Sequence, residues 1–170
     1  MKTIVHNDDN LKENEINNIV KRAKVLIINS NDEFLLAKVN GAIHVIGGHV
    51  KKGETDQETI VREVKEEVGI NILFNKSEPF INIKYFCKSF PNKDTNTMFS
   101  ANYYIIKNDD KPNLDKTNLE QSEIDGNFEL LYIKKDNVLK ELKNSIKYAK
   151  NKNVIYDTID VVTEYLKRGE

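Results

Sequence analysis

The sequence predicts a domain of the mixed α/β (α+β) class, in which helices pack against a mixed β-sheet. Three observations support this prediction: strand-like apolar runs early in the chain, one helix with clear start and stop signals, and then further strands followed by amphipathic helices. The length of 170 residues, with 39% hydrophobic and 31% charged side chains, is typical of a soluble globular domain. No repeat or linker divides residues 1–170, so we expect a single domain.

The first predicted strands are two short apolar runs, residues 25–28 and 34–39. The polar residues 29–32 between them are typical of a tight turn. Residues 1–20 form an ambiguous N-terminal lead-in, in which 11–20 fits either a short helix or irregular chain.

The later strands are richer in aromatic side chains. Residues 81–90 alternate between apolar and polar side chains, which predicts a half-buried strand. Residues 98–106 and 129–133 predict two more strands on either side of a polar loop, 108–127. Apolar residues then recur at helical spacing, which predicts two C-terminal helices within residues 135–168.

One helix has sharply defined ends. Thr55 and Glu58 form a capping box at its start, and Gly69 supplies the left-handed residue that ends it. About 13 residues of helix lie between these signals, roughly 20 Å. We expect one stripe of apolar side chains to pack on the sheet, formed by Ile60, Val61, Val64 and Val68.

The same helix gathers three carboxylates, those of Glu63, Glu66 and Glu67, on a flank beside the apolar stripe. Like charges three or four residues apart on a helix repel by about 0.2–0.5 kcal/mol per pair. One interpretation is a solvated helix face, since charged faces are common. The other is a site for a hard divalent cation such as Mg²⁺, which takes oxygen ligands and bridges to substrate phosphates.

The three carboxylates belong to a longer pattern within residues 48–70. The segment reads GHVKKGETDQETIVREVKEEVGI: glycine, five residues, glutamate, seven residues, Arg-Glu-Val, one residue, Glu-Glu, one residue, Gly-Ile. This pattern resembles the complete signature of the Nudix hydrolase family, with every fixed position filled. Ile46 departs from the proline that family members often carry before the paired glycines, and we interpret it as a change in loop stiffness.

The resemblance implies a Nudix-type mixed β-sheet sandwiched between helices. It also implies hydrolysis of a phosphoanhydride (pyrophosphate) bond in a nucleoside diphosphate linked to another group, with Mg²⁺ or Mn²⁺ as cofactor. By position, the metal ligands are Glu63, Glu66, Glu67 and the backbone carbonyl of Gly47. One glutamate is expected to take the proton of the attacking water as general base, and we favour Glu66 over Glu63.

Arg62 is one of only three arginines among 26 basic residues, so lysine serves at almost every other basic position. A planar guanidinium holds a carboxylate by two hydrogen bonds, which lysine cannot do. The resemblance implies that Arg62 orients the catalytic glutamates and pairs with Glu54. The alternative is an ordinary surface pair with Glu58, four residues earlier.

Substrate contacts are harder to predict. Tyr85 lies near the place where a tyrosine recurs in the diadenosine polyphosphate hydrolases of this family, although it also fits plain core packing. The loop 108–127 carries Glu120, Glu123 and Asp125, of which we assign Glu123 to the substrate site. The alternative for these acidic residues is a solvated loop.

Charge and composition narrow the function. With 26 basic and 27 acidic side chains the formal net charge is −1, which disfavours nucleic acid as a partner and with it an RNA 5′-end pyrophosphohydrolase. A nucleotide-binding module without catalysis is a second alternative, disfavoured because a binder has no reason to keep repelling carboxylates. The expected partner is therefore a small-molecule nucleotide derivative.

The sequence also suggests a location. No run approaches the roughly 20 apolar residues that a membrane helix needs, so no membrane partner is expected. Cys87 is the single cysteine, which excludes an intrachain disulfide and favours the cytoplasm. The oligomeric state is left open, with a homodimer among the alternatives.

Overall fold

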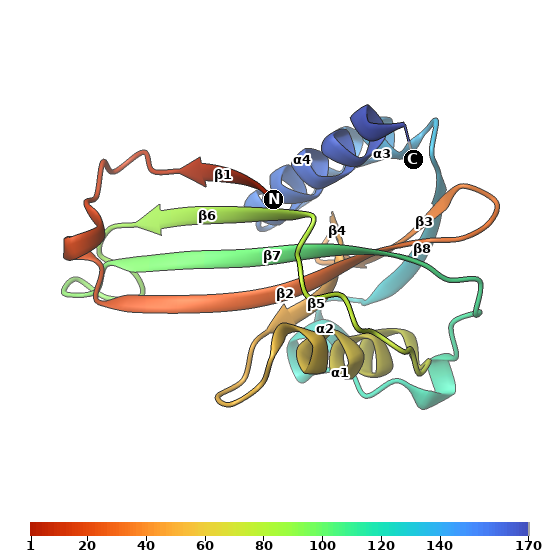
Figure 1. The fold of residues 1–170 in the computed structure, drawn as a ribbon. Helices are drawn as coiled ribbons and strands as arrows, with labels where there is room; N and C mark the ends of the chain where they lie inside the picture. Colours follow the sequence, from red (N-terminus) through yellow and green to blue (C-terminus); the bar gives the residue numbers. More distant parts are fainter. Residues whose placement is uncertain (170) are drawn as a thin grey trace.

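The computed structural model describes residues 1–169 as one mixed sheet with helices on both faces (Figure 1). The strand order is β1-β6-β7-β2-β3-β4, with β5 paired to β2 and β8 paired to β3. β2 is parallel to β7 and β1 is parallel to β6, whereas the remaining pairs are antiparallel. The strands are β1 (Lys2–His6), β2 (Asn18–Ile28), β3 (Glu33–Val39), β4 (Ala42–His44), β5 (Ile46–His49), β6 (Ile81–Cys87), β7 (Thr97–Lys107) and β8 (Glu129–Lys134).

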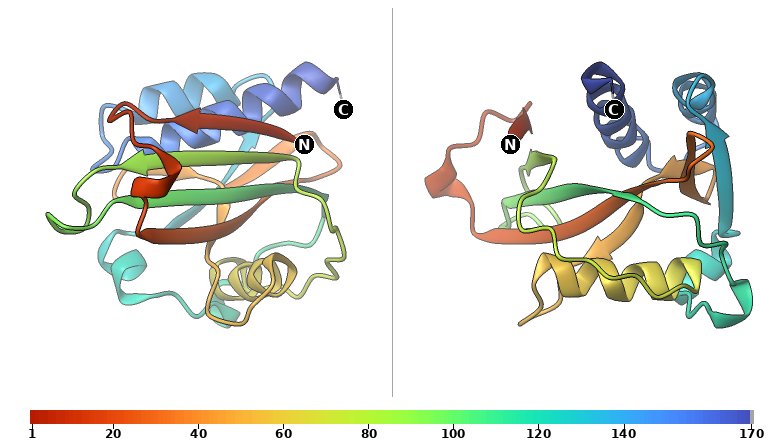
Figure 2. Two further views of the ribbon diagram at one scale, coloured as in Figure 1. Left: turned by 60° about the vertical axis from the view of Figure 1, so that its left-hand side comes forward. Right: turned by 45° about the vertical axis from the view of Figure 1, so that its right-hand side comes forward.

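Each face of the sheet has its own hydrophobic core. Side chains of β2 alternate between the two cores, because successive residues of a strand point to opposite faces. Val25 and Ile27 pack with helix α1 (Asp56–Val68), whereas Leu26 and Ile28 belong to the core under helices α3 (Val138–Ser145) and α4 (Asn153–Arg168). Both views in Figure 2 show α1 on one side of the sheet and the C-terminal helices on the other. The predicted mixed sheet between helices is confirmed.

Helix α1 has the ends that its sequence predicts. The Thr55 amide donates to the Glu58 carboxylate at 2.8 Å, and the Thr55 hydroxyl accepts from the Glu58 amide at 3.2 Å. Gly69 ends the helix in the left-handed conformation, with φ of 73°. In the predicted stripe, Ile60, Val64 and Val68 are fully buried and Val61 is partly buried.

Residues 1–20 contain more regular structure than the predicted lead-in. β1 pairs with β6, with Lys2 opposite Ile81 and His6 opposite Tyr85. A short 3-10 helix, η1 (Glu13–Glu15), follows, and β2 already begins at Asn18. β1 is an edge strand whose side chains are mostly exposed, so its sequence shows little alternation of apolar and polar residues. Its pairing with β6 is what makes it a strand.

We predicted a polar loop for residues 108–127. The structure differs, because this segment contains the 3-10 helix η2 (Leu114–Lys116) and the short helix α2 (Gln121–Asp125). Neither element has the apolar periodicity that would reveal it in the sequence. The loop is fastened to the end of α1, where the amides of Asn113 and Asn118 donate to the carbonyls of Val68 and Glu66 at 2.9 and 2.8 Å. These bonds satisfy carbonyls that a helix end leaves without partners.

The two C-terminal helices form as predicted. Their buried side chains complete the core on that face, and the largest of them, Tyr165 of α4, meets Phe34 of β3 edge to face, with ring centroids 5.6 Å apart. Within residues 1–169, no helix has both the length and the apolar character needed to cross a membrane.

Candidate active site

The paired glycines of β5 bring the backbone directly against α1. Gly47 has a φ of +126°, and a Cβ at this position would lie 2.4 Å from the carbonyl oxygen of Ala23. A Cβ at Gly48 would lie 2.4 Å from the Glu63 carboxylate. Gly47 is therefore required by the close backbone of β2, whereas a side chain at Gly48 would displace the Glu63 carboxylate.

Glu67 is buried between the glycines and the helix rather than on a solvated flank. Its side chain is 2% exposed, and its Oε1 accepts a hydrogen bond from the Gly47 amide at 3.0 Å. Its Oε2 is also buried and has no hydrogen-bond partner within residues 1–169. Burial raises the pKa of Glu67 well above its ordinary value, and the charges of Glu63 and Glu123 act in the same direction.

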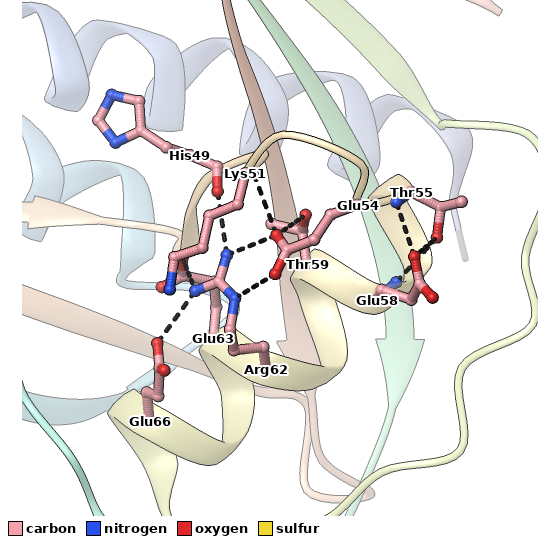
Figure 3. Close-up of polar contacts among 9 residues, drawn as sticks. All are labelled: His49, Lys51, Glu54, Thr55, Glu58, Thr59, Arg62, Glu63 and Glu66. Carbon is pink, nitrogen blue, oxygen red and sulfur yellow. Dashed lines mark hydrogen bonds and ion pairs between the residues drawn. The ribbon is translucent and has the colours of Figure 1, made fainter.

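Arg62 is the centre of the polar network in Figure 3. Its Nε and Nη2 donate to the two oxygens of Glu54 at 2.8 and 2.9 Å, which is a two-pronged contact. Its Nη1 donates to Glu63 at 2.6 Å and to Glu66 at 3.0 Å, and its Nη2 also reaches the His49 carbonyl at 3.0 Å. One guanidinium thus holds three carboxylates and the end of β5.

The carboxylate of Glu54 is held from several directions. The hydrogen bonds from Arg62 are the main cause that lowers the pKa of Glu54 to about 2. The Thr59 hydroxyl and the Lys51 amide also donate to it, at 2.9 and 3.1 Å. Glu58, the alternative partner of Arg62, instead accepts from the amide and hydroxyl of Thr55. The structure places Arg62 beside Glu54, as the resemblance implies.

The proposed metal ligands are near one another but do not form a finished metal site. Among residues 1–169, no three His, Cys, Asp or Glu side chains are arranged so that they could hold a metal ion. Glu63 and Glu66 both face Arg62, whereas Glu67 faces Gly47. The donor set still fits a hard divalent cation, because it offers carboxylate oxygens and one buried oxygen that lacks a partner.

A first cavity of about 310 Å³ opens beside these residues. Glu63 and Gly48 line it from the Nudix-like segment, and Glu120 and Glu123 line it from the loop before and within α2. The structure therefore brings Glu123 to the predicted site. Burial raises the pKa of Glu123, and the charges of Glu120 and Glu63 add to this effect.

Basic residues that the sequence analysis did not single out line the same cavity. They come from β2, from the turn after β5 and from the segment before α4: Arg22, Lys24, Lys51 and Lys150. Lys24 is the most unusual, since it is 6% exposed within the buried part of β2. A single lysine in the apolar run AKVLII was the available signal, because lysine is rarely fully buried.

Tyr85 lies in a different place from the predicted metal ligands. It lines a second cavity of about 350 Å³, together with residues of β7 and α4. Its hydroxyl donates to Asp157, and its ring stacks on His6 with a centroid distance of 4.4 Å. Arg22, Lys24, Asn151 and Val154 line both cavities, so Tyr85 lies in a neighbouring part of one cleft.

Comparison with known structures identifies the fold. Similar chains include the MutT protein from Methanosarcina mazei Go1 (TM-score 0.56, 16% identity, covering 88% of this chain and 96% of that one). A second is the mMutator MutT protein from Bacillus halodurans (TM-score 0.53, 19% identity, covering 84% of this chain and 82% of that one). A third is a binary complex of the C. elegans Ap4A hydrolase (TM-score 0.51, 18% identity, covering 88% of this chain and 96% of that one). At these identities the likeness concerns the fold alone.

Comparison with family models identifies the family. The NUDIX domain model matches residues 19–144, which is most of the chain. No curated protein matches the sequence. The family match supports the predicted enzyme class, a Nudix-type pyrophosphohydrolase. The chain belongs to the Nudix domain family.

Proposed function

We propose that the protein is a metal-dependent pyrophosphohydrolase that cleaves a phosphoanhydride bond in a nucleoside diphosphate linked to another group. The observation that carries this proposal is the contact of one guanidinium, that of Arg62, with Glu54, Glu63 and Glu66 beside the paired glycines. A guanidinium that holds three carboxylates fixes their positions, and such positioning contributes strongly to catalysis.

Mg²⁺ or Mn²⁺ would be held by Glu63, Glu66, Glu67 and the Gly47 carbonyl. Such an ion neutralises phosphate oxygens and acidifies water. The partnerless Oε2 of Glu67 is the observation of this structure that supports the assignment. Arg62 would keep Glu63 and Glu66 oriented, while the fixed Gly47 amide orients Glu67.

We assign the general base to Glu66. Its side chain is 26% exposed, compared with 14% for Glu63, so water reaches Glu66 more easily. Arg62 donates to one of its oxygens at 3.0 Å and keeps the carboxylate oriented, and a lone pair that neither Arg62 nor the metal occupies would take the proton.

The basic residues of the first cavity suit a phosphorylated substrate. Lys24, Lys51, Lys150 and Arg22 line this cavity together with Glu63, Glu120 and Glu123. The names MutT and Ap4A hydrolase of the similar structures also point to nucleotide substrates. Assay of a substrate panel identifies the leaving group.

The test is release of phosphate and pyrophosphate from nucleotide sugars, dinucleotides and nucleoside triphosphates, with Mg²⁺, with Mn²⁺ and with a chelator. We expect hydrolysis only with metal, and a loss of at least about a hundredfold in Glu66→Gln. Glu58→Gln is the matched control, since Glu58 lies on the same helix and forms its side-chain hydrogen bonds with Thr55. Undiminished turnover in Glu66→Gln, or turnover in chelator, would contradict the proposal.

A further inference from the structure

The second cavity has a different character from the first. Four aromatic residues line it: Tyr85, Phe90, Phe99 and Tyr103. Phe90 and Phe99 lie with their ring centroids 5.6 Å apart, and the Arg22 guanidinium is 5.8 Å from the centroid of Phe99. Its volume of about 350 Å³ falls within the range of small-molecule sites, about 300–1,000 Å³. A cavity lined by aromatic rings suits a flat heterocycle, because every nucleotide base has a π-face on which an aromatic side chain can stack.

Asp157, at the start of α4, places a carboxylate in this aromatic cavity. Its Oδ1 accepts from the Tyr85 hydroxyl, and its Oδ2 accepts from the buried Tyr103 hydroxyl at 3.2 Å. A carboxylate offers about four acceptor positions, so these two bonds leave room for further donors. Burial raises the pKa of Asp157, whereas the tyrosine hydrogen bonds and the charge of Lys24 favour its ionised form.

Lys24 lies where the two cavities meet. Its amine forms no hydrogen bond and no ion pair in the part of the chain that the structure describes. Burial and the charge of Arg22 lower the pKa of Lys24, and the charges of Asp157, Glu67 and Glu63 only partly oppose this. A buried cation without a direct partner is unfavourable, and a bound anion relieves this. The buried Nε of Arg22 also lacks a partner within residues 1–169. A phosphate at this junction would satisfy both.

We propose that the second cavity binds the base of the nucleotide, and that Asp157 selects a purine with adjacent N–H donors, as in guanine, over adenine. The inference deepens the proposed function, on which it rests for the nucleotide nature of the ligand. Guanine presents N1–H and the N2 amino group side by side, which match a carboxylate. Adenine presents one amino group beside the N1 lone pair, which would face the negative oxygens of Asp157.

The test measures binding rather than turnover. Calorimetric titration of Glu66→Gln in metal-free buffer compares GDP, IDP and ADP. We expect GDP to bind about 10- to 100-fold more tightly than ADP, with IDP between them because it lacks the N2 amino group. Asp157→Asn offers one donor and one acceptor, so it should weaken GDP binding, strengthen ADP binding and reverse the preference.

Asp160→Asn is the matched control. Asp160 lies one turn along α4, faces His6 at 3.7 Å and does not line the second cavity. Its replacement should leave the GDP to ADP ratio unchanged. A change of ratio in this variant equal to that in Asp157→Asn would overturn the assignment to Asp157.

Two other results would overturn the inference. One is equal affinity for the three nucleotides, or no binding of any of them, with Asp157 intact; this result needs no Asp157 variant and stands even if Asp157→Asn does not fold. The other is an unchanged ratio in a cooperatively melting Asp157→Asn. If the protein hydrolyses nucleotides but binds GDP and ADP equally, only this inference is contradicted. If it prefers GDP but hydrolyses no substrate, only the proposed function is contradicted.

Discussion

The two cavities that meet at Lys24 are built in different ways. Residues close together in sequence form one wall of the first, since Gly47 and Gly48 belong to β5 and Glu63 belongs to α1, where Arg62 holds it. The second joins strands β6 and β7 to α4, and the Tyr85–Asp157 bond spans 72 residues. The wall that would carry chemistry is a local arrangement, whereas the wall that would choose the substrate depends on the whole fold. Variants of the two walls should therefore have separable effects.

The largest expected effect tests the local wall. Arg62→Lys keeps the charge but loses the two-pronged contact with Glu54, and a carboxylate displaced by about 1 Å can slow a reaction about a hundredfold. We expect that loss in kcat, with only a small fall in the melting temperature, because lysine keeps the positive charge beside Glu54. Steady-state kinetics and thermal melts check it.

Glu58→Ala is the control for Arg62→Lys. It removes the residue that an ordinary surface pair would have used, and in the structure Glu58 contacts Thr55 instead. Its turnover should stay near normal. A lysine variant with full turnover would reduce Arg62 to a surface residue and remove the contrast between the two walls.

The paired glycines should separate folding from chemistry. A Cβ at Gly47 would meet the backbone of β2 in a left-handed conformation, so Gly47→Ala should lower the free energy of unfolding by about 2 kcal/mol. A Cβ at Gly48 would meet the movable Glu63 carboxylate, so Gly48→Ala should fold normally and lose about tenfold or more in kcat. Denaturant unfolding and kinetics of both variants measure this difference. Equal losses of stability would contradict it.

Lys24 tests the junction between the cavities. Lys24→Met removes the buried amine but keeps a long apolar side chain, so we expect KM to rise about tenfold with little change in kcat. The variant should be at least as stable as the original, since a buried cation without a direct partner is lost. Lys21→Met, on the exposed part of the same strand, is the matched control. A fall in kcat with unchanged KM would assign Lys24 to the chemical step instead.

The smallest expected effect concerns Glu67. Glu67→Gln keeps an acceptor for the Gly47 amide and removes a charge that burial disfavours, so the metal-free variant should be as stable as the original or more stable by up to about 1 kcal/mol. Glu54→Gln should melt lower, because it loses part of the contact with Arg62. Thermal melts in chelator compare the two variants. A clear fall for Glu67→Gln would show that this residue is structural.

The sequence predicts those features whose signals lie within one element. Thr55, Glu58 and Gly69 fix the ends of α1 through local hydrogen bonds and backbone conformation, and the structure has the helix there. The strands rich in branched and aromatic side chains were also predicted from the sequence, with shifts at some of their ends. β1, β4, β5 and α2 were not predicted. An exposed edge strand and a five-residue helix carry no apolar period, and β4 and β5 have only three and four residues.

The candidate site divides in the same way. Helical spacing placed Glu63, Glu66 and Glu67 together, but it did not show that Glu67 is buried against Gly47, which depends on how closely β5 approaches α1. Lys24 and Asp157 could not be assigned from sequence. Their roles depend on strand and helix positions that are set only when both cores pack.

The fastening of the loop to α1 limits where the chain can vary in length. Because Asn113 and Asn118 bind the last turn of α1, the short path from there to Glu123 fixes an acidic side chain relative to Glu66 and Glu67. Residues added between β7 and Asn113 would extend an exposed loop and leave this path untouched. Residues added between Asn118 and Glu123 would shift α2 along the cavity. Relatives of this chain that keep the site should therefore vary in the length of the segment between β7 and Asn113. The length of the segment between Asn118 and Glu123 should stay the same.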